Sequence, residues 1–178
     1  DLGTTAFSLF PEVFSDEKPA GDGSALVVGR ENDTRIAKWI KKEYLKLPDN
    51  FESYKVVVPK SNGSGHFGES LSSPFVAAPF HAQNTTFLSI GKFDSIFEAE
   101  ACLKYIKTKF VRCMLGILKV TQDNPKSVWS KVPLQNFTQQ SDINWDLSIP
   151  DLDAALYQKY NLTQDEIDFI ESNVSAMQ

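Results

Sequence analysis

A long amphipathic segment that follows Ser95 limits the folds open to this chain. Ser95-Ile96-Phe97-Glu98 has the pattern of a capping box, in which a hydroxyl and a carboxylate satisfy backbone N–H groups at a helix start. Apolar residues then recur at spacings of three and four, at Leu103, Ile106, Phe110, Met114 and Ile117. This spacing predicts one long helix whose apolar stripe is buried in the core.

Shorter runs before this helix have the composition of β-strands. Residues 25–29 predict a strand and residues 31–34 a turn, after which residues 35–45 fit either a returning strand or a helix. We choose the returning strand, so that the first two strands form a hairpin. The β-branched run Tyr54–Pro59 and residues 85–90 predict two further strands, both buried.

Two short helices are expected near the end of the chain. Residues 148–160 and 163–176 have helical patterns separated by Asn161, and a second capping box, Thr163-Gln164-Asp165-Glu166, opens the later one. Together with the strands, these elements predict the α+β class. We expect a mixed β-sheet packed on one long central helix, with the two short C-terminal helices closing the edge.

The length of 178 residues is enough for one compact domain. Turn-forming residues 16–24 follow an aromatic-rich start, so we expect residues 1–24 to be an N-terminal extension or linker and residues 25–178 to be the domain. Residues 70–91 contain no Asp, Glu, Lys or Arg, but they include two prolines and His81, which excludes a membrane-spanning helix there. The chain begins with Asp1, and we expect it to be a piece of a longer polypeptide.

The net charge of −5 hides an uneven distribution along the chain. Residues 1–29 hold one basic and five acidic residues, residues 30–131 hold sixteen basic and ten acidic residues, and residues 132–178 hold one basic and eight acidic residues. The middle of the chain is therefore basic. Such a layout suits a module whose central surface meets a polyanion, although solvated charge explains many local excesses.

The two cysteines, Cys102 and Cys113, both fall in the long predicted helix. Eleven residues at a rise of about 1.5 Å separate them by roughly 16 Å, too far for a disulfide. Two free thiols are typical of a reducing setting, so we expect a cytoplasmic protein.

Gly63, Gly65 and Gly68 form a G-x-G-x-x-G pattern after the strand Tyr54–Pro59. In a dinucleotide-binding turn this pattern opens a helix, whereas residues 69–74 here have no helical period. A plain flexible loop and a loop that contacts phosphate or base edges are the remaining interpretations. In the second case the donors are Lys60, Ser61, Asn62 and Ser64.

Catalytic motifs are missing from the sequence. The two histidines, His66 and His81, lack zinc-site spacing, and no nucleophile elbow or Pro-Pro dipeptide occurs. Asp49, Glu52 and Lys55 are too closely spaced for the usual nuclease signature. An independent Mg²⁺-dependent nuclease that uses Glu52 is thus the least favoured alternative.

Several ordered blocks resemble one protein family. They begin with Tyr54-Lys-Val-Val-Val-Pro-Lys-Ser-Asn-Gly-Ser-Gly65 and Phe67-Gly-Glu69, and continue with Phe87–Gly91, Leu103–Phe110, Leu115–Asn124 and Val132–Phe137, then Asp142–Trp145, Leu156–Tyr160 and residues 167–172. These blocks resemble the C-terminal region of bacterial restriction-modification methyltransferases. Such proteins are adenine-specific enzymes of type II-like systems, often described as restriction endonucleases. The resemblance spans about residues 25–175.

The resemblance implies a division of labour between two parts of such an enzyme. The N-terminal part carries the S-adenosylmethionine site and the Pro-Pro loop, while the C-terminal part recognises the DNA target. This chain would be the sequence-specific DNA-binding, target-recognition domain, with no cofactor of its own and S-adenosylmethionine in the missing methyltransferase domain. Its partners would be double-stranded DNA and the N-terminal methyltransferase domain of the same bacterial, cytoplasmic polypeptide, without a membrane.

The resemblance and the basic middle also predict the residues that contact DNA. The expected base-reading loop consists of Lys60, Ser61, Asn62, Ser64 and Gly65. The expected phosphate-positioning residues are Arg30, Lys38, Lys41 and Lys55. Thr121, Gln122 and Asn124 are either further base contacts or a turn that ends the helix. We expect Lys104, Lys107 and Arg112 to form a solvated helix face.

A protein-protein interaction or scaffolding domain of a larger enzyme is the main alternative. It rests on the acidic flanks and on Phe7, Phe10 and Phe14, which we expect to be exposed.

Overall fold

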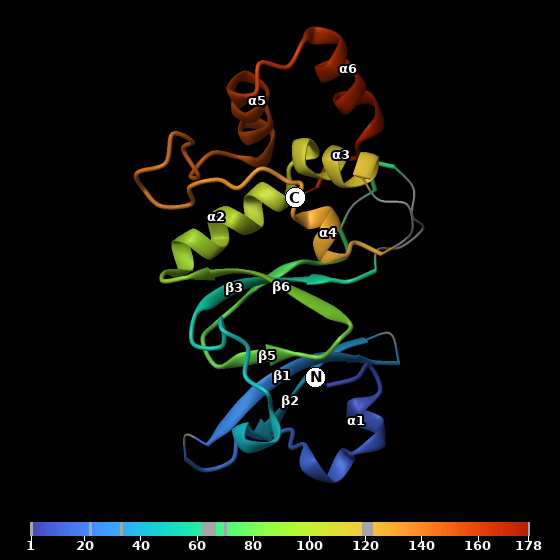
Figure 1. Cartoon of the computed structure of the whole chain (residues 1–178), viewed down its shortest axis with the longest axis vertical. Coiled ribbons are helices and arrows are strands. Elements are labelled where there is room, and N and C mark those ends of the chain that lie inside the picture. Colours follow the sequence, from blue (N-terminus) through green and yellow to red (C-terminus); the bar gives the residue numbers. More distant parts are fainter. Residues whose placement is uncertain are drawn as a thin grey trace. The chain divides into compact units, whose positions relative to one another are not determined.

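A computed structural model confirms the α+β class and describes residues 2–21, 23–32, 34–61, 67–69, 71–118 and 123–177 (Figure 1). The chain divides into two compact units. Unit 1 comprises Asp1–Lys60 and Phe75–Ile96, and unit 2 comprises Ser61–Pro74 and Phe97–Gln178. Unit 1 holds the strands, and unit 2 holds most of the helical residues.

The predicted hairpin is the centre of the first sheet in unit 1. Strand β1 (Ser24–Glu31) pairs antiparallel with β2 (Thr34–Lys41) along its full length, and β5 (His81–Gln83) joins the other edge of β1 in parallel. Asn32 has a φ of 49° in the connecting turn, a conformation that asparagine tolerates better than most residues. The helix alternative for residues 35–45 is therefore wrong.

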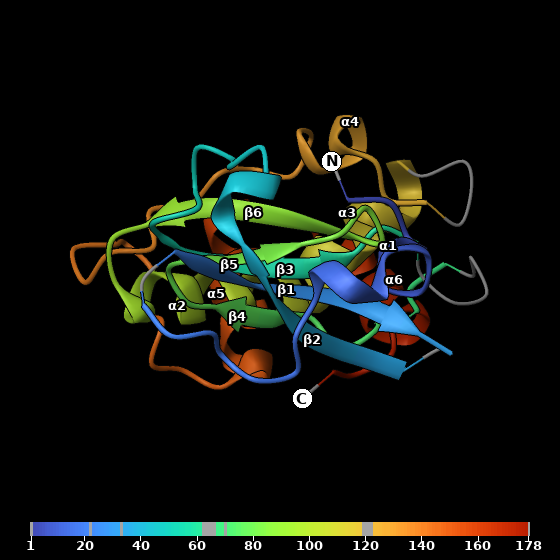
Figure 2. The ribbon, with the colours of Figure 1, turned by 90° about the horizontal axis from the view of Figure 1, so that it is seen from below.

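The remaining strands of unit 1 form a second, antiparallel sheet in the order β4-β3-β6. These strands are β3 (Tyr54–Pro59), β4 (Phe75–Ala77) and β6 (Phe87–Phe93). The expected single mixed sheet is thus two small sheets, because β3 pairs with β4 and β6 and not with the hairpin. Figure 1 shows the two sheets as separate layers, and in Figure 2 the hairpin lies in front of the second sheet. Val28, Val57, Ala77 and Phe87 fill the space between the layers.

A second apolar cluster covers the opposite face of the hairpin sheet, because neighbouring strand residues point to opposite faces. Phe7, from α1 (Ala6–Leu9), is 2% exposed there and packs with Val27 and Phe51. Phe14, which follows the 3₁₀ turn η1 (Pro11–Val13), packs edge-to-face on Phe7 with ring centroids 4.8 Å apart. The expected exposure is therefore wrong for Phe7, which belongs to the core of unit 1, and is confirmed for Phe10, which is 54% exposed.

The helices of unit 2 include the two C-terminal helices that the sequence predicted, α5 (Ile149–Lys159) and α6 (Gln164–Asn173). The hydroxyl of Thr163 and the carboxylate of Glu166 form the expected capping box of α6. Asn161, with a φ of 52°, separates the two helices. A short helix, α4 (Lys126–Trp129), precedes them.

The predicted long helix is divided at Thr108 into α2 (Ile96–Lys107) and α3 (Lys109–Leu118). The carboxylate of Asp153, from α5, accepts hydrogen bonds from the backbone N–H groups of Lys109 at 3.1 Å and Phe110 at 2.9 Å. The hydroxyl of Thr108 accepts the N–H of Val111 at 3.2 Å. These contacts start a new helix at Thr108, because they satisfy N–H groups that a continuous helix would bond internally.

The cysteine side chains lie in the interior of unit 2. Cys102 and Cys113 are free and buried, and burial raises the pKa of the Cys102 thiol to about 12. The expected apolar stripe is buried at Ile106 and Phe110 but exposed at Ile117. Among the described residues, none of the helices has the length and apolar character needed to span a bilayer.

Candidate functional site

The hairpin of unit 1 carries three of the predicted DNA contacts. Arg30 lies opposite Arg35 in the β1–β2 register, near the turn, and both side chains are exposed. The Arg35 guanidinium also lies 4.6 Å from the centroid of the Phe75 ring. Lys41, at the end of β2, is exposed and shares a strand face with Arg30 and Arg35, because it is an even number of residues from Arg35.

Lys38 lies on the opposite face of β2 and is half-buried. Its Nζ atom is 5.8 Å from the centroid of the Phe7 ring and 4.0 Å from the Asp16 carboxylate. The structure therefore does not bring Lys38 together with Lys41 on one strand face.

Lys55 is completely buried, which corrects its assignment as a phosphate contact. Its Nζ atom donates hydrogen bonds to the carbonyl oxygens of Asn50 at 3.0 Å, Ser53 at 3.1 Å and Phe51 at 3.4 Å. Burial lowers the pKa of Lys55 to about 8. The ammonium organises the 50–53 turn from inside and is not presented to a ligand.

His81, on β5, lies half-buried in the same unit. Burial and the nearby charge of Lys55 both lower the pKa of His81. The imidazole is therefore held toward its neutral form, consistent with a packing role.

The two segments predicted to read bases meet at Ser61. Ser61 forms an isolated antiparallel bridge with Asp123, and its hydroxyl donates a hydrogen bond to the Asp123 carboxylate. Asn124 is 1% exposed, so its amide does not reach the surface, which corrects its assignment as a base contact. Lys60 is exposed at the end of β3. Asn62, Ser64, Gly65, Thr121 and Gln122 lie outside the described residues.

Two of the three cations on the predicted helix face have structural roles instead. The guanidinium of Arg112 is buried and donates to the carbonyl oxygens of Lys107 at 3.0 Å and Ser175 at 2.5 Å. Lys104 donates to the carbonyl oxygen of Trp145 at 2.8 Å. The expectation of a solvated face is wrong for Arg112, because three separate chain segments converge on it.

A surface that the sequence reasoning missed follows directly after β2. It consists of Lys41, Lys42, Tyr44, Lys46 and Phe80, and we call it the cation–aromatic surface. The 3₁₀ turn η2 (Lys42–Tyr44) leaves the Tyr44 ring 55% exposed, with the Lys41 Nζ atom 5.9 Å from its centroid. The Lys42 Nζ atom lies 4.9 Å from the centroid of the Phe80 ring, which is 48% exposed. The alternation of lysines with tyrosine was visible in the sequence, but we had assigned residues 35–45 to a strand.

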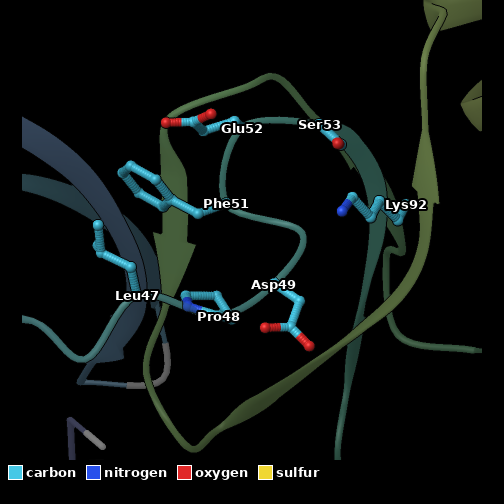
Figure 3. Close-up of a pocket in the computed structure, with 7 residues that line it drawn as sticks. All are labelled: Leu47, Pro48, Asp49, Phe51, Glu52, Ser53 and Lys92. Carbon is cyan, nitrogen blue, oxygen red and sulfur yellow. The ribbon is translucent and has the colours of Figure 1, made fainter.

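A shallow pocket of about 360 Å³ lies next along the chain, in the 47–53 turn (Figure 3). Figure 3 shows Lys92 reaching toward this turn, while Asp49 and Glu52 point to opposite sides of it. Two carboxylates beside one lysine do not favour a phosphate. Within the described part of the chain, no group of three or more His, Cys, Asp or Glu side chains is arranged to hold a metal ion. The remaining lining residues are Leu47, Pro48, Phe51 and Ser53.

No protein-family model, no curated protein and no solved structure matches this chain.

Proposed function

We propose that this chain binds DNA as the target-recognition part of an adenine-specific restriction-modification methyltransferase. The observation that carries the proposal is the density of cations in one short segment of unit 1. Residues 34–46 hold five basic side chains and only one acidic side chain, and Arg35, Lys41 and Lys46 are exposed. A cluster of this kind attracts the phosphate backbone, because each contact releases condensed counterions.

Two ion pairs within unit 1 compete with phosphate for these cations. Lys41 lies 3.5 Å from Glu43, and Lys38 lies 4.0 Å from Asp16. At least one member of each pair is well exposed to solvent. Exposed pairs contribute little free energy, typically below about 1 kcal/mol, so a phosphate can replace the carboxylate at small cost.

The test is duplex binding followed by fluorescence anisotropy over a range of salt concentrations. Lys41→Ala combined with Lys46→Ala removes two exposed cations from the proposed surface. Lys126→Ala combined with Lys131→Ala is the matched control, because it removes two exposed cations from unit 2. Each phosphate contact makes the slope of log K against log salt concentration more negative by about 0.9. The Lys41→Ala/Lys46→Ala variant should therefore have a less steep slope, smaller in magnitude by up to about 2.

The control pair should bind like the unmodified chain. The proposal fails if the unmodified chain binds no duplex even at low salt. It also fails if the two double variants weaken binding equally, because a general charge effect would then explain the loss.

A further inference from the structure

Phe80 has two unusual features. Its backbone is in the left-handed conformation, which bulky residues rarely adopt, and its aromatic ring lies at the surface. Its φ is 65°, in the left-handed region that favours glycine and asparagine. The turn fixes this conformation, because the Phe80 N–H donates to the carbonyl oxygen of Phe51 at 2.8 Å. A strained residue with an exposed aromatic ring is the kind of outlier from which a functional role is inferred.

The interior of unit 1 supports the Phe80 ring. It packs edge-to-face on Phe51 with centroids 5.8 Å apart and an interplanar angle of 74°. Phe51 is itself 3% exposed and belongs to the core cluster of the hairpin sheet. Phe51 thus holds the Phe80 side chain in place, while Phe80 is still 48% exposed, which makes its ring a fixed platform at the surface.

One lysine lies directly against the Phe80 ring. The Lys42 Nζ atom lies 4.9 Å from the Phe80 centroid and 5.9 Å from the Phe51 centroid. Lys41 and Lys46 are exposed close by in the sequence, and Glu43 is the acidic residue within the same stretch. Aromatic rings interleaved with lysines are the combination that binds single-stranded nucleic acid, because every base has a π-face and every linkage has a phosphate.

We propose that Phe80 stacks on an unpaired nucleobase of bound DNA, while Lys42 and its neighbouring lysines contact the adjoining phosphates. This inference rests on the proposed DNA-binding function and narrows the substrate to DNA in which at least one base has left the helical stack. Tyr44 is also exposed, at 55%, and lies beside Lys41.

The variants are chosen so that weaker DNA binding caused by unfolding can be distinguished from weaker binding caused by the loss of stacking. Phe80→Gly removes the ring and also relieves the left-handed backbone, so the variant should remain folded. Phe80→Trp keeps an aromatic face. Phe169→Ala is the matched control, because Phe169 is 49% exposed but lies on α6 in unit 2.

Two probes separate stacking from duplex binding. One is a fully paired duplex, and the other is the same duplex with one bulged 5-iodouracil, which crosslinks on irradiation to an aromatic side chain stacked on it. We expect the unmodified chain to prefer the bulged probe and the crosslink to map to Phe80. Phe80→Gly should weaken binding of the bulged probe about 5- to 150-fold, the range typical of one lost base–aromatic stack. It should leave binding of the paired duplex unchanged, as should Phe169→Ala for both probes.

Each other result has a definite meaning. If the chain binds paired DNA with no preference for the bulge, or if the crosslink maps elsewhere, the stacking proposal is overturned and the DNA-binding function stands. If the chain binds and crosslinks only the bulged probe, stacking is supported and duplex recognition is overturned. If the chain binds neither probe, both proposals are overturned.

Discussion

Lys55 and Arg112 are charged residues whose predicted roles the structure corrects. Each was assigned to a surface because Lys and Arg are usually exposed, yet each is buried and bonded to main-chain carbonyl oxygens. For Lys55 a signal was present in the sequence, since it lies in a run of β-branched residues expected to be buried on both faces. For Arg112 no local signal existed, because its acceptors come from residues 68, 69 and 175 as well as Lys107.

The first prediction at the scale of single residues concerns the ionisation of Lys55. Burial lowers its pKa from 10.5 to about 8 in the folded chain. Between these two values the unfolded chain binds more protons, so the contribution of Lys55 to the free energy of unfolding rises as the pH increases from about 8 to 10.5. Below about pH 8 the ammonium is charged in both the folded and the unfolded chain, so its burial destabilises the folded chain by the full amount.

The measurement is a titration of the lysine Nζ and Cε resonances by NMR, with Lys55→Arg used to assign the Lys55 signal. The Lys55 signal should titrate near pH 8. A Lys55 resonance that titrates near 10.5 would show that the ammonium is solvated, and the account of the 50–53 turn would be wrong.

Among the secondary-structure elements, locally encoded features were predictable and features set by distant residues were not. The capping box at Thr163 and the β1–β2 hairpin depend on residues within a few positions of each other, and both are confirmed. The division at Thr108 depends on Asp153, which lies more than forty residues away along the chain. The pattern of residues 95–118 alone does not predict the contact with Asp153. The pairing of β3 with β4 and β6 is equally non-local.

The second prediction tests the cap of α3. Asp153→Ala removes a buried carboxylate that accepts hydrogen bonds from the backbone N–H groups of Lys109 and Phe110. We expect the free energy of unfolding to fall by about 2 to 4 kcal/mol, because both N–H groups are left without an acceptor in a buried setting. Urea denaturation followed by circular dichroism measures this change.

Asp146→Ala provides the comparison, since the Asp146 side chain is exposed. It should change the free energy of unfolding by less than about 0.5 kcal/mol. If Asp153→Ala were as mild as this control, the division at Thr108 would need another cause.

Over the whole molecule, the basic middle of the sequence is divided between the two units. Residues 30–60 and residues 97–131 fall in different units, and Lys55, Lys104 and Arg112 are engaged in main-chain contacts. The exposed cations of unit 1 are concentrated in residues 30–46, with Lys60 and Lys92 elsewhere in the unit, and unit 2 exposes Lys126 and Lys131. Linear charge counting locates the cations along the chain, but the fold decides which of them face solvent. The aromatic partners of these lysines come partly from Phe80, far along the chain, which charge counting does not detect.

The central claim is that the exposed lysines of residues 34–46 contact DNA. It is tested most directly by measuring whether bound DNA protects these lysines from chemical acetylation. The folded chain is treated with an acetylating reagent with and without a saturating DNA duplex, and mass spectrometry compares the modification of each exposed lysine. The account predicts that DNA protects Lys41 and Lys46 and leaves Lys126 and Lys131 as reactive as before. Protection of Lys126 and Lys131 alone, or no protection of any lysine by a duplex that demonstrably binds, would contradict it.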